Sequence, residues 1–387
     1  MQAFIVDALR TAGGRRNGRL AGWHPADLGA EVLDALVART GIDPAAIEDV
    51  ILGCVSQGGE QSSALGRNAV LASRLPQSVP AVTIDRQCGS SQQAVQFAAQ
   101  AVMSGTQDVV IACGVESMSR VPMFSTASLY AKAGIGTGPW SGRIRERFGV
   151  SDFSQFRGAE AIARAYGFTR GDLDAFALES HRRAAAATRD GAFADEIVPL
   201  AVAEGQHTVD EGIRADATAE GLAGLQPLAE GGALTAGNAS QICDGASAAL
   251  IVSERALKAH GLVPLARIDT LLVTAGDPVI MLEEPLPATQ KALARAGRTI
   301  GEIDLYEVNE AFASIPLAWL KATGADPARL NVHGGAIALG HPLGASGTRL
   351  MATLVHALRR RKARFGLQTM CEGGGMANVT IIENLVL

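Results

Sequence analysis

The chain has 387 residues, of which 48% are apolar and 19% are charged, and its formal net charge at pH 7 is −5. This composition is typical of a globular protein with two or three domains' worth of core, and it excludes a disordered or fibrous chain. The acidic balance argues against a nucleic-acid or anionic-membrane partner, and no apolar run is long enough to span a bilayer.

Cysteine usage indicates the compartment. The cysteines are odd in number and include no CxxC pair, which argues against a disulfide framework and against a zinc site, so we expect no metal. The first residues show no secretory pattern, and the last show no peroxisomal address. We therefore expect a cytoplasmic protein. Its five cysteines are Cys54, Cys88, Cys113, Cys243 and Cys371.

In chain order, strand and helix patterns alternate over the first 117 residues. Short apolar runs predict strands over residues 2–8, 49–55 and 108–114. Helical spacing of apolar residues predicts helices over 26–42 and 91–105. Such alternation is typical of α/β layers with largely parallel strands.

A different stretch follows, residues 118–242, which is rich in Gly, Arg and Ser. It contains an evident loop over 133–143 and a helix over 171–191, which starts at an Asp-containing cap region and closes near Gly191. Because this stretch lies outside the pattern of its neighbours, we expect it to be a lid or binding domain.

The last part of the chain repeats the first. Residues 289–312 have the same order as residues 32–55: helix, glycine break, short acidic turn, strand. This match places Ile47 and Ile303 256 residues apart, and a later match pairs Cys113 with Cys371, 258 apart. We predict two similar α/β halves about a pseudo-twofold axis. The domains are then 1–117 plus 243–262, 118–242, and 263–387.

Cys88 is the candidate nucleophile. It stands in "DRQCGSSQQAVQF", at a predicted strand-to-helix turn, where free N–H groups and the helix dipole favour a thiolate and lower the thiol pKa. The plainer interpretation is a small buried side chain. Cys54, Cys113 and Cys243 are expected to be structural.

Two histidines fall in the glycine-rich "NVHGGAIALGHPLGASG". His341 precedes a proline, which biases it toward an extended loop, and it is the candidate base for Cys88. "GASG" occupies the place in the second half that "GSSQ" occupies in the first, so the two helix starts are expected to face one site. For His333 a hydrogen-bonded histidine at a strand end is the plainer interpretation.

Other motifs leave two interpretations open. Asn309 and Glu310 in "YEVNEAFA" are either site residues or a capping device. "CEGGG" either brings bare backbone to a reacting carbonyl beside Cys371 or forms a plain tight turn. The basic clusters "RRNGR" and "RRRKAR" are either solvated surface or contacts to an anion such as a ligand phosphate.

Taken together, five motifs in this order resemble the thiolases, which make or cleave 3-ketoacyl-CoA: "CGSSQQA", "TAGNASQICDGASA", "VNEAFA", "NVHGGAIALGHPLGASG" and "CEGGGMA". The resemblance covers essentially the whole chain. It implies a five-layered α-β-α-β-α fold from two duplicated halves, with an inserted loop domain that binds CoA. It also implies a homodimer or homotetramer, with acyl-CoA and CoA as substrates and no cofactor.

The resemblance also implies roles for single residues. Cys88 matches the acylated nucleophile, His341 its base, and Cys371 the cysteine that moves a proton at the α-carbon of acetyl-CoA. Asn309 matches the residue that holds a water, which forms one oxyanion hole with His341. The backbone N–H groups of Cys88 and Gly373 match the other hole. Contacts to CoA are expected from Ala236, Gly237 and Ser240.

Three features depart from the common family pattern. Ser91 stands where many members have glycine, and Glu372 stands where the residue is usually apolar or small. "SQFRGAE" replaces the His-Met-Gly-x-Thr-Ala-Glu of many short-chain biosynthetic members. The acyl-pocket candidates are therefore Ser154, Gln155 and Phe156, a segment similar to that of degradative actinobacterial thiolases, some of which act on bulky or steroid-derived chains.

We therefore expect a thiolase that cleaves 3-ketoacyl-CoA to acetyl-CoA and a shortened acyl-CoA, or runs the reverse condensation. The alternatives are a short-chain biosynthetic acetoacetyl-CoA thiolase and a catalytically silent CoA-binding subunit. A decarboxylating ketoacyl synthase relative would need neither Cys371 nor "GHPLGASG".

Overall fold

The structure is a computed structural model that describes residues 1–386. One large mixed sheet has the strand order β11-β12-β13-β10-β1-β9-β5-β3-β4, with β2 beside β9 and β6 beside β1. A separate hairpin pairs β7 with β8. The strands are β1 Ala3–Thr11, β2 Gly14–Arg15, β3 Asp49–Gly53, β4 Ala81–Ile84, β5 Val109–Ser117, β6 Ile197–Val198, β7 Leu200–Val202, β8 Gly205–His207, β9 Cys243–Ser253, β10 Ala266–Ala275, β11 Leu305–Val308, β12 Phe365–Glu372 and β13 Met376–Asn384.

The sheet consists of two halves that meet at β1 and β10. There, Phe4 and Ile5 pair with Arg267 and Ala266. In the first half β3 is parallel to β4 and β5, whereas β9 is antiparallel to β5 and β1. In the second half β11 and β12 are parallel, and β13 is antiparallel to β12 and β10. The prediction of largely parallel pairing is therefore wrong, because apolar runs do not encode strand direction.

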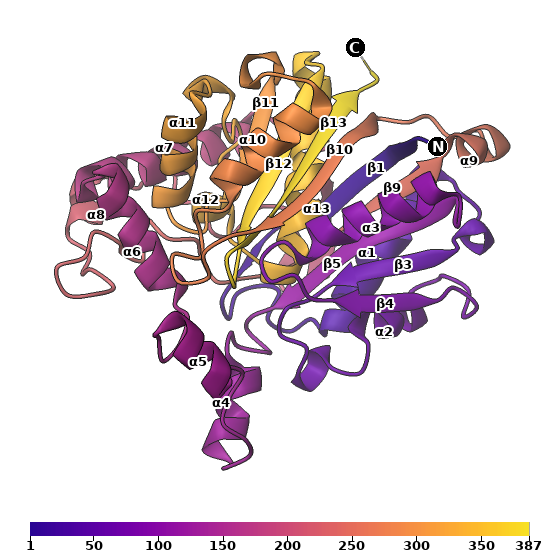
Figure 1. Cartoon of the computed structure of the whole chain (residues 1–387). Helices are drawn as coiled ribbons and strands as arrows, with labels where there is room; N and C mark the ends of the chain where they lie inside the picture. Colours follow the sequence, from indigo (N-terminus) through magenta and orange to yellow (C-terminus); the bar gives the residue numbers. More distant parts are fainter. Residues whose placement is uncertain (387) are drawn as a thin grey trace.

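Helices cover both faces of each half (Figure 1). One apolar core joins α1 and α2 to the first half-sheet, and another joins α10 and α11 to the second. Between the half-sheets, α3 and α13 share a third core with β1, β5, β9 and β10. This is the predicted five-layered order. The bounds are α1 Pro25–Thr40, α2 Leu65–Ala72, α3 Ser90–Ser104, α9 Glu254–His260, α10 Pro285–Ala296, α11 Ser314–Thr323, α12 Ala336–Leu339 and α13 Ser346–Arg361.

Corresponding elements of the two halves begin 256 residues apart. This holds for the 3-10 turns η1 (Pro44–Ala46) and η3 (Ile300–Glu302), for β3 and β11, for α3 and α13, and for β5 and β12. The pairing of Ile47 with Ile303 agrees with this spacing. The pairing of Cys113 with Cys371 is wrong by two residues, because Cys113 pairs with Leu52 whereas Thr369 holds the matching place beside Val308. A two-residue shift keeps every side chain on its face, so the sequence pattern does not reveal it.

Residues between β5 and β9 form the inserted segment. Its helices are α4 Ser125–Lys132, α5 Gly142–Phe148, α6 Gln155–Tyr166, α7 Arg170–Arg189 and α8 Ala219–Ala223. The long helix α7 starts at a capping box between Thr169 and Asp172. Helices α6 and α7 contribute to the core of the second half, whereas α4 and α5 project from the body as an arm (Figure 1). Among residues 1–386, every helix is too short or too polar to cross a bilayer.

Candidate active site

Cys88 lies in a tight turn between β4 and α3. The residue before it, Gln87, has a φ of +50°, a strained left-handed conformation for a residue with a side chain. Ser90 holds this turn, because its Oγ accepts the Arg86 N–H at 2.9 Å and donates to the Gln87 carbonyl at 2.6 Å. The Cys88 side chain is buried in a cluster with one residue at the start of the inserted segment and three of the second half: Met118, Leu343, Leu350 and Met370.

The turn that carries Cys88 faces the turn that follows Cys371. A Cβ on Gly89 would collide with the carboxylate of Glu372, and a Cβ on Gly373 would lie 2.8 Å from Gln87 Oε1. Glycine fits at both positions because the side chains of Glu372 and Gln87 occupy the space that a Cβ would take. The "CEGGG" turn therefore packs against the nucleophile turn, and its role at a reacting carbonyl stays a prediction.

The starts of α3 and α13 cross closely beside Cys88. A Cβ on Gly347 would collide with the backbone of Gln92, and Ser91 Oγ accepts the Thr348 N–H at 2.9 Å. The two helix starts therefore pack against one another, and that they face one shared site stays a prediction. Ser91 fits in place of the usual glycine because it is buried and hydrogen-bonded.

His341 lies in the loop before α13, and its hydrogen bonds fix its tautomer. Ser346 Oγ donates to the Pro342 carbonyl at 2.9 Å and lies 2.5 Å from His341 Nδ1. Because this hydroxyl proton is already used, Oγ accepts from Nδ1–H, and Nε2 keeps its lone pair. A second bond, from the His341 N–H to the Gln241 carbonyl at 2.9 Å, holds the backbone.

Asn309 links His341 to Cys371. Its Nδ2 lies 3.4 Å from His341 Nε2, and the same side chain acts to lower the Cys371 pKa, against the larger effect of burial. The Oδ1 atom of Asn309 is buried and has no hydrogen-bond partner within residues 1–386. A free buried acceptor of this kind can receive a hydrogen bond from a water or a substrate.

Burial sets the protonation states in this cluster. It raises the pKa of Cys371 to about 12 and lowers that of His341 to about 3. Burial also raises the pKa of Cys88 well above its usual value, and the neighbouring Cys371 and Glu372 act in the same direction. The predicted lowering of the Cys88 pKa is therefore wrong. Both thiols and the imidazole are neutral at rest, so charge develops only during reaction.

The acyl-pocket candidates lie at the start of α6. Ser154 caps this helix by accepting the Arg157 N–H. Gln155 Nε2 lies 4.0 Å from Met123 Sδ, and Met123 packs against the cluster that contains Cys88. Phe156 stacks edge-on against Phe312 at 5.5 Å and is 39% exposed.

The CoA-binding candidates divide between two places. Ala236 and Gly237 line a cavity of about 260 Å³, together with His181, Arg214 and Gln241. Ser240 lies outside that lining, and its N–H donates to the Ala311 carbonyl at 2.9 Å, beside the Asn309 loop. The segment from Ala236 to Ser240 therefore runs from the cavity to residues 311–313, next to the Asn309 loop.

The remaining candidates have structural contacts. Cys54, Cys113 and Cys243 are buried and free. Glu310 accepts hydrogen bonds from Ser180 Oγ at 2.7 Å and from the N–H of Ile337 in α12 at 3.1 Å, so capping is its observed role. The prediction for His333 is wrong, because its buried Nδ1 has no partner within the described chain.

Sequence reasoning missed two buried polar residues that support the site. Ser346, which orients His341, is the serine of the "GASG" motif, and that motif was the signal that could have identified it. Glu116 accepts the N–H groups of Val55 at 2.9 Å and Gly344 at 2.8 Å, and so holds the His341 loop against the first half. Its signal was a single charged residue in an otherwise apolar run.

Comparison with known proteins gives consistent results. The chain matches the thiolase N-terminal domain over residues 3–255 and the thiolase C-terminal domain over residues 262–384. It is 53% identical over 386 residues to a steroid 3-ketoacyl-CoA thiolase of Mycobacterium tuberculosis, covering 99% of this chain and 94% of that protein. It is 43% identical to an acetyl-CoA acetyltransferase of Escherichia coli, covering 98% of both chains. A 3-ketoacyl-CoA thiolase of Yersinia pestis is 42% identical and covers 98% of this chain and 99% of its own length.

Proposed function

The chain belongs to the thiolase family of acyltransferases, and we propose that it cleaves 3-ketoacyl-CoA thioesters with bulky, steroid-derived acyl chains. The observation that carries this proposal is the contact of the α6 start with the nucleophile cluster, through Gln155 and Met123. The similarity to the steroid 3-ketoacyl-CoA thiolase supports the substrate class. Phe156 offers an apolar wall of the kind that a large acyl group would contact.

In the first half-reaction, Cys88 loses its thiol proton to His341 Nε2, and Sγ bonds to the C3 carbonyl carbon. The C2–C3 bond then breaks, and its electron pair remains on C2 as the enolate of acetyl-CoA. Cys371 donates its thiol proton to C2 and becomes a thiolate. The free lone pair on His341 Nε2 and the neutral resting thiols support this order of proton transfers.

In the second half-reaction, CoA removes the acyl group. The Cys371 thiolate takes the proton of the CoA thiol, and the CoA sulfur attacks the acyl carbon on Cys88. The Cys88 sulfur leaves and recovers its proton from His341. Each group then returns to its starting state, so the cycle needs no co-reactant beyond CoA.

Two groups of donors serve the oxyanions. We assign the N–H groups of Cys88 and Gly373 to the tetrahedral intermediate, and His341 with a water on Asn309 to the thioester oxygen. The facing of the two turns supports the first assignment, and the unpartnered Oδ1 of Asn309 supports the second. One such donor typically lowers the activation barrier by about 2.7–4 kcal/mol.

We assign CoA binding to the inserted segment, residues 118–242. The cavity lined by Ala236, Gly237 and Arg214 supports this role, because a guanidinium pairs well with a phosphate. The segment between the cavity and Ser240 would carry the pantetheine arm toward Cys88. The two thiolase halves are then residues 1–117 with 243–262, and residues 263–387.

We assign the protein to the cytoplasm as a homodimer or homotetramer. Free buried cysteines support a reducing compartment. The edge strand β4, with Val82 44% exposed, and the exposed apolar side chains of the arm support self-association. On the arm these are Phe124, Leu129, Tyr130 and Ile135. Light scattering behind size exclusion measures the state, and a monomer at micromolar concentration would contradict it.

CoA-dependent thiolysis tests the substrate class. The assay compares acetoacetyl-CoA with a 3-ketoacyl-CoA that carries a steroid nucleus, and Cys88→Ala serves as the control. We expect a higher kcat/KM for the steroid substrate and no turnover by the variant. A preference for acetoacetyl-CoA would instead support a short-chain acetyltransferase, a function that the 43% identity to the Escherichia coli enzyme favours.

A further inference from the structure

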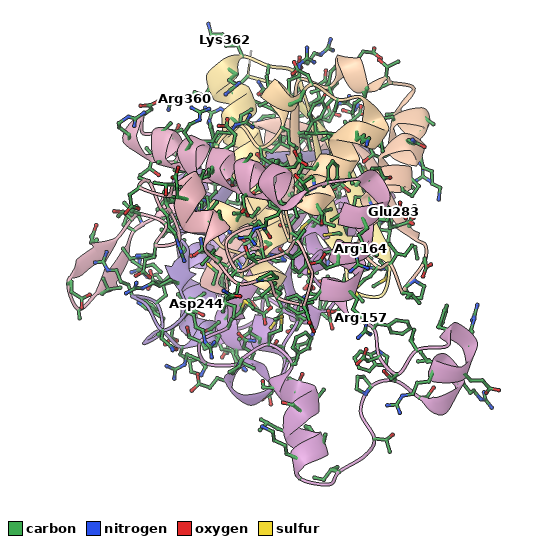
Figure 2. All side chains as sticks on the ribbon, turned by 90° about the vertical axis from the view of Figure 1, so that its left-hand side faces the viewer. Arg157, Arg164, Asp244, Glu283, Arg360 and Lys362 are labelled. Atoms are coloured by element: carbon green, nitrogen blue, oxygen red, sulfur yellow. The ribbon has the colours of Figure 1, made fainter. Side chains whose placement is uncertain are left out.

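A second cavity, of about 550 Å³, lies away from the cysteines. It is lined by the C-terminal part of α7, the C-terminal end of α13 and residues 328–333. None of its lining residues also lines the cavity at Ala236 and Gly237. Figure 2 shows Arg360, at the end of α13, beside α7, and Lys362 farther out on the same chain end.

Cations outnumber anions around this cavity. Four arginines and two carboxylates line it. Arg182 and Arg183 share the carboxylate of Glu179, at 2.6 and 2.7 Å. Arg360 donates to two backbone carbonyls, those of Asp190 at 2.8 Å and Gly191 at 3.2 Å. These acceptors are neutral, so they do not offset the positive charge of Arg360.

Arg361 is the least compensated of these cations. Arg361 is exposed at the helix end, and within residues 1–386 no carboxylate acts on its pKa. Partial burial and the charge of Arg183 lower the pKa of Arg361. An arginine that is repelled rather than paired is stabilised by an added anion.

His333 adds a polar group in the lining of the same cavity. It is 8% exposed, and its Nδ1 is buried without a partner within the described residues. Its ring packs edge-on against Phe193 at 5.7 Å, which fixes its orientation. Burial lowers the His333 pKa to about 4, and Arg361 and Arg360 act in the same direction. Alanine side chains of α7 and of residue 328 complete the wall and leave room for a ligand.

We propose that this cavity is a binding site for a small phosphate-bearing anion, separate from the CoA site. The arginines supply the charge and the fork geometry that a phosphate accepts, and the His333 ring forms part of the cavity wall. The cluster "RRRKAR" is then partly a binding element rather than a solvated helix end only. The inference does not depend on the proposed acyl substrate.

Calorimetric titration of the full-length protein tests this proposal, with saturating CoA present so that the catalytic pocket is already occupied. Inorganic phosphate and adenosine 5′-monophosphate are the two probes, and they distinguish a free phosphate from a nucleotide as the source of the anion. We expect saturable binding of at least one probe, with a stoichiometry of one per chain.

Two matched variants locate the site. Arg361→Gln and Lys362→Gln each remove one positive charge from the same helix end, but only Arg361 lines the cavity. We expect Arg361→Gln to weaken binding about tenfold, the loss of one charge-assisted hydrogen bond, and Lys362→Gln to leave it within about twofold. Equal weakening in both variants, binding that CoA abolishes, or no saturable binding of either probe would overturn the proposal.

Discussion

The two central helices, α3 and α13, begin in the same way but serve different chemistry. Ser90 and Ser346 stand 256 residues apart, and each bonds back over the loop before its helix. Ser90 holds only backbone around Cys88, whereas Ser346 also accepts from the imidazole of His341. The duplication thus repeats the support of a helix start, and the two copies differ in the reactive group that this support holds.

A second matched pair shows the same contrast. Glu116 and Glu372 also stand 256 residues apart, at the ends of β5 and β12. Glu116 lies against Gly344 of the other half and accepts hydrogen bonds at both oxygens. Glu372 lies against Gly89 of the other half, and neither of its oxygens has a partner within residues 1–386. The carboxylate of Glu116 is thus hydrogen-bonded at both oxygens, whereas the carboxylate of Glu372, beside the nucleophile, is not.

The largest expected effect comes from filling the two glycine contacts. In Gly344→Ala the new Cβ would lie 2.6 Å from Cys54 Cα and 2.7 Å from the Gly53 carbonyl, so backbone must move. We expect a loss of about 3 kcal/mol in the free energy of unfolding. In Gly89→Ala the collision is with the side chains of Glu372 and Asn378.

A double variant separates these two cases. Gly89→Ala with Glu372→Ala should recover most of the stability that Gly89→Ala loses, because the main obstacle is removed. Gly344→Ala has no such rescue, because its two nearest neighbours are backbone atoms. Urea denaturation measures the free energy of unfolding of the native protein, Gly344→Ala, Gly89→Ala and the double variant. A failure of Glu372→Ala to rescue Gly89→Ala would contradict the contact between the halves.

The serine pair should differ in catalysis. In Ser346→Ala the imidazole loses the acceptor for Nδ1–H, so the tautomer with a free Nε2 is no longer favoured. We expect kcat to fall about 30-fold, less than the roughly 10²–10⁴-fold that a general base contributes because His341 itself remains, with a smaller change in KM and a shifted pH profile. Ser90→Ala should mainly lower stability, by about 1 kcal/mol. Similar kcat losses with unchanged pH profiles would show that both serines are merely structural.

The glutamate pair should differ in stability. Glu116→Gln places an amide NH₂ where backbone N–H groups already donate, and we expect a loss of about 1–3 kcal/mol. Glu372→Gln breaks no hydrogen bond within the described structure, so we expect no loss at pH 7. Thermal unfolding of both variants checks this order, and the reverse order would show that Glu372 has a partner in solution.

The smallest effect is a slope with pH. Burial raises the Glu372 pKa above 4.5, opposed by Arg86 and by the nearby Asn378 backbone N–H and aided by Asp85. The native state therefore keeps a proton that the unfolded state releases, so stability falls as pH rises from about 4.5 toward the folded pKa, by at most about 1.4 kcal/mol per unit. Glu372→Gln should flatten this fall relative to the native protein. Parallel curves for the two proteins would place the Glu372 pKa at its ordinary value.

Much of the fold and of the site follows from local pattern. The strand-to-helix turn at Cys88, the layered order and the spacing of Ile47 and Ile303 depend on periodicity and on glycines, which a sequence displays directly. Strand direction and the two-residue error at Cys113 were not accessible, because period-two patterns are the same in either direction and after any even shift.

The thiol pKa values could not be predicted from the sequence, for a different reason. A helix start favours a thiolate, but whether water reaches that start depends on how the second half packs over it. Met370 and Leu343 come from distant segments and enclose Cys88. Desolvation then outweighs the helix dipole, and the balance is visible only once both halves are in place.

Mass spectrometry of the acyl-enzyme tests the central claim most directly, namely that a nucleophile of the first half is served by a base of the second. The protein is mixed with a 3-ketoacyl-CoA without free CoA, quenched, digested and searched for the acyl mass, beside a His341→Asn variant. We predict that the acyl group is on Cys88 and that it forms much more slowly in the variant. An acyl group on Cys371, or formation at an unchanged rate without His341, would contradict the account.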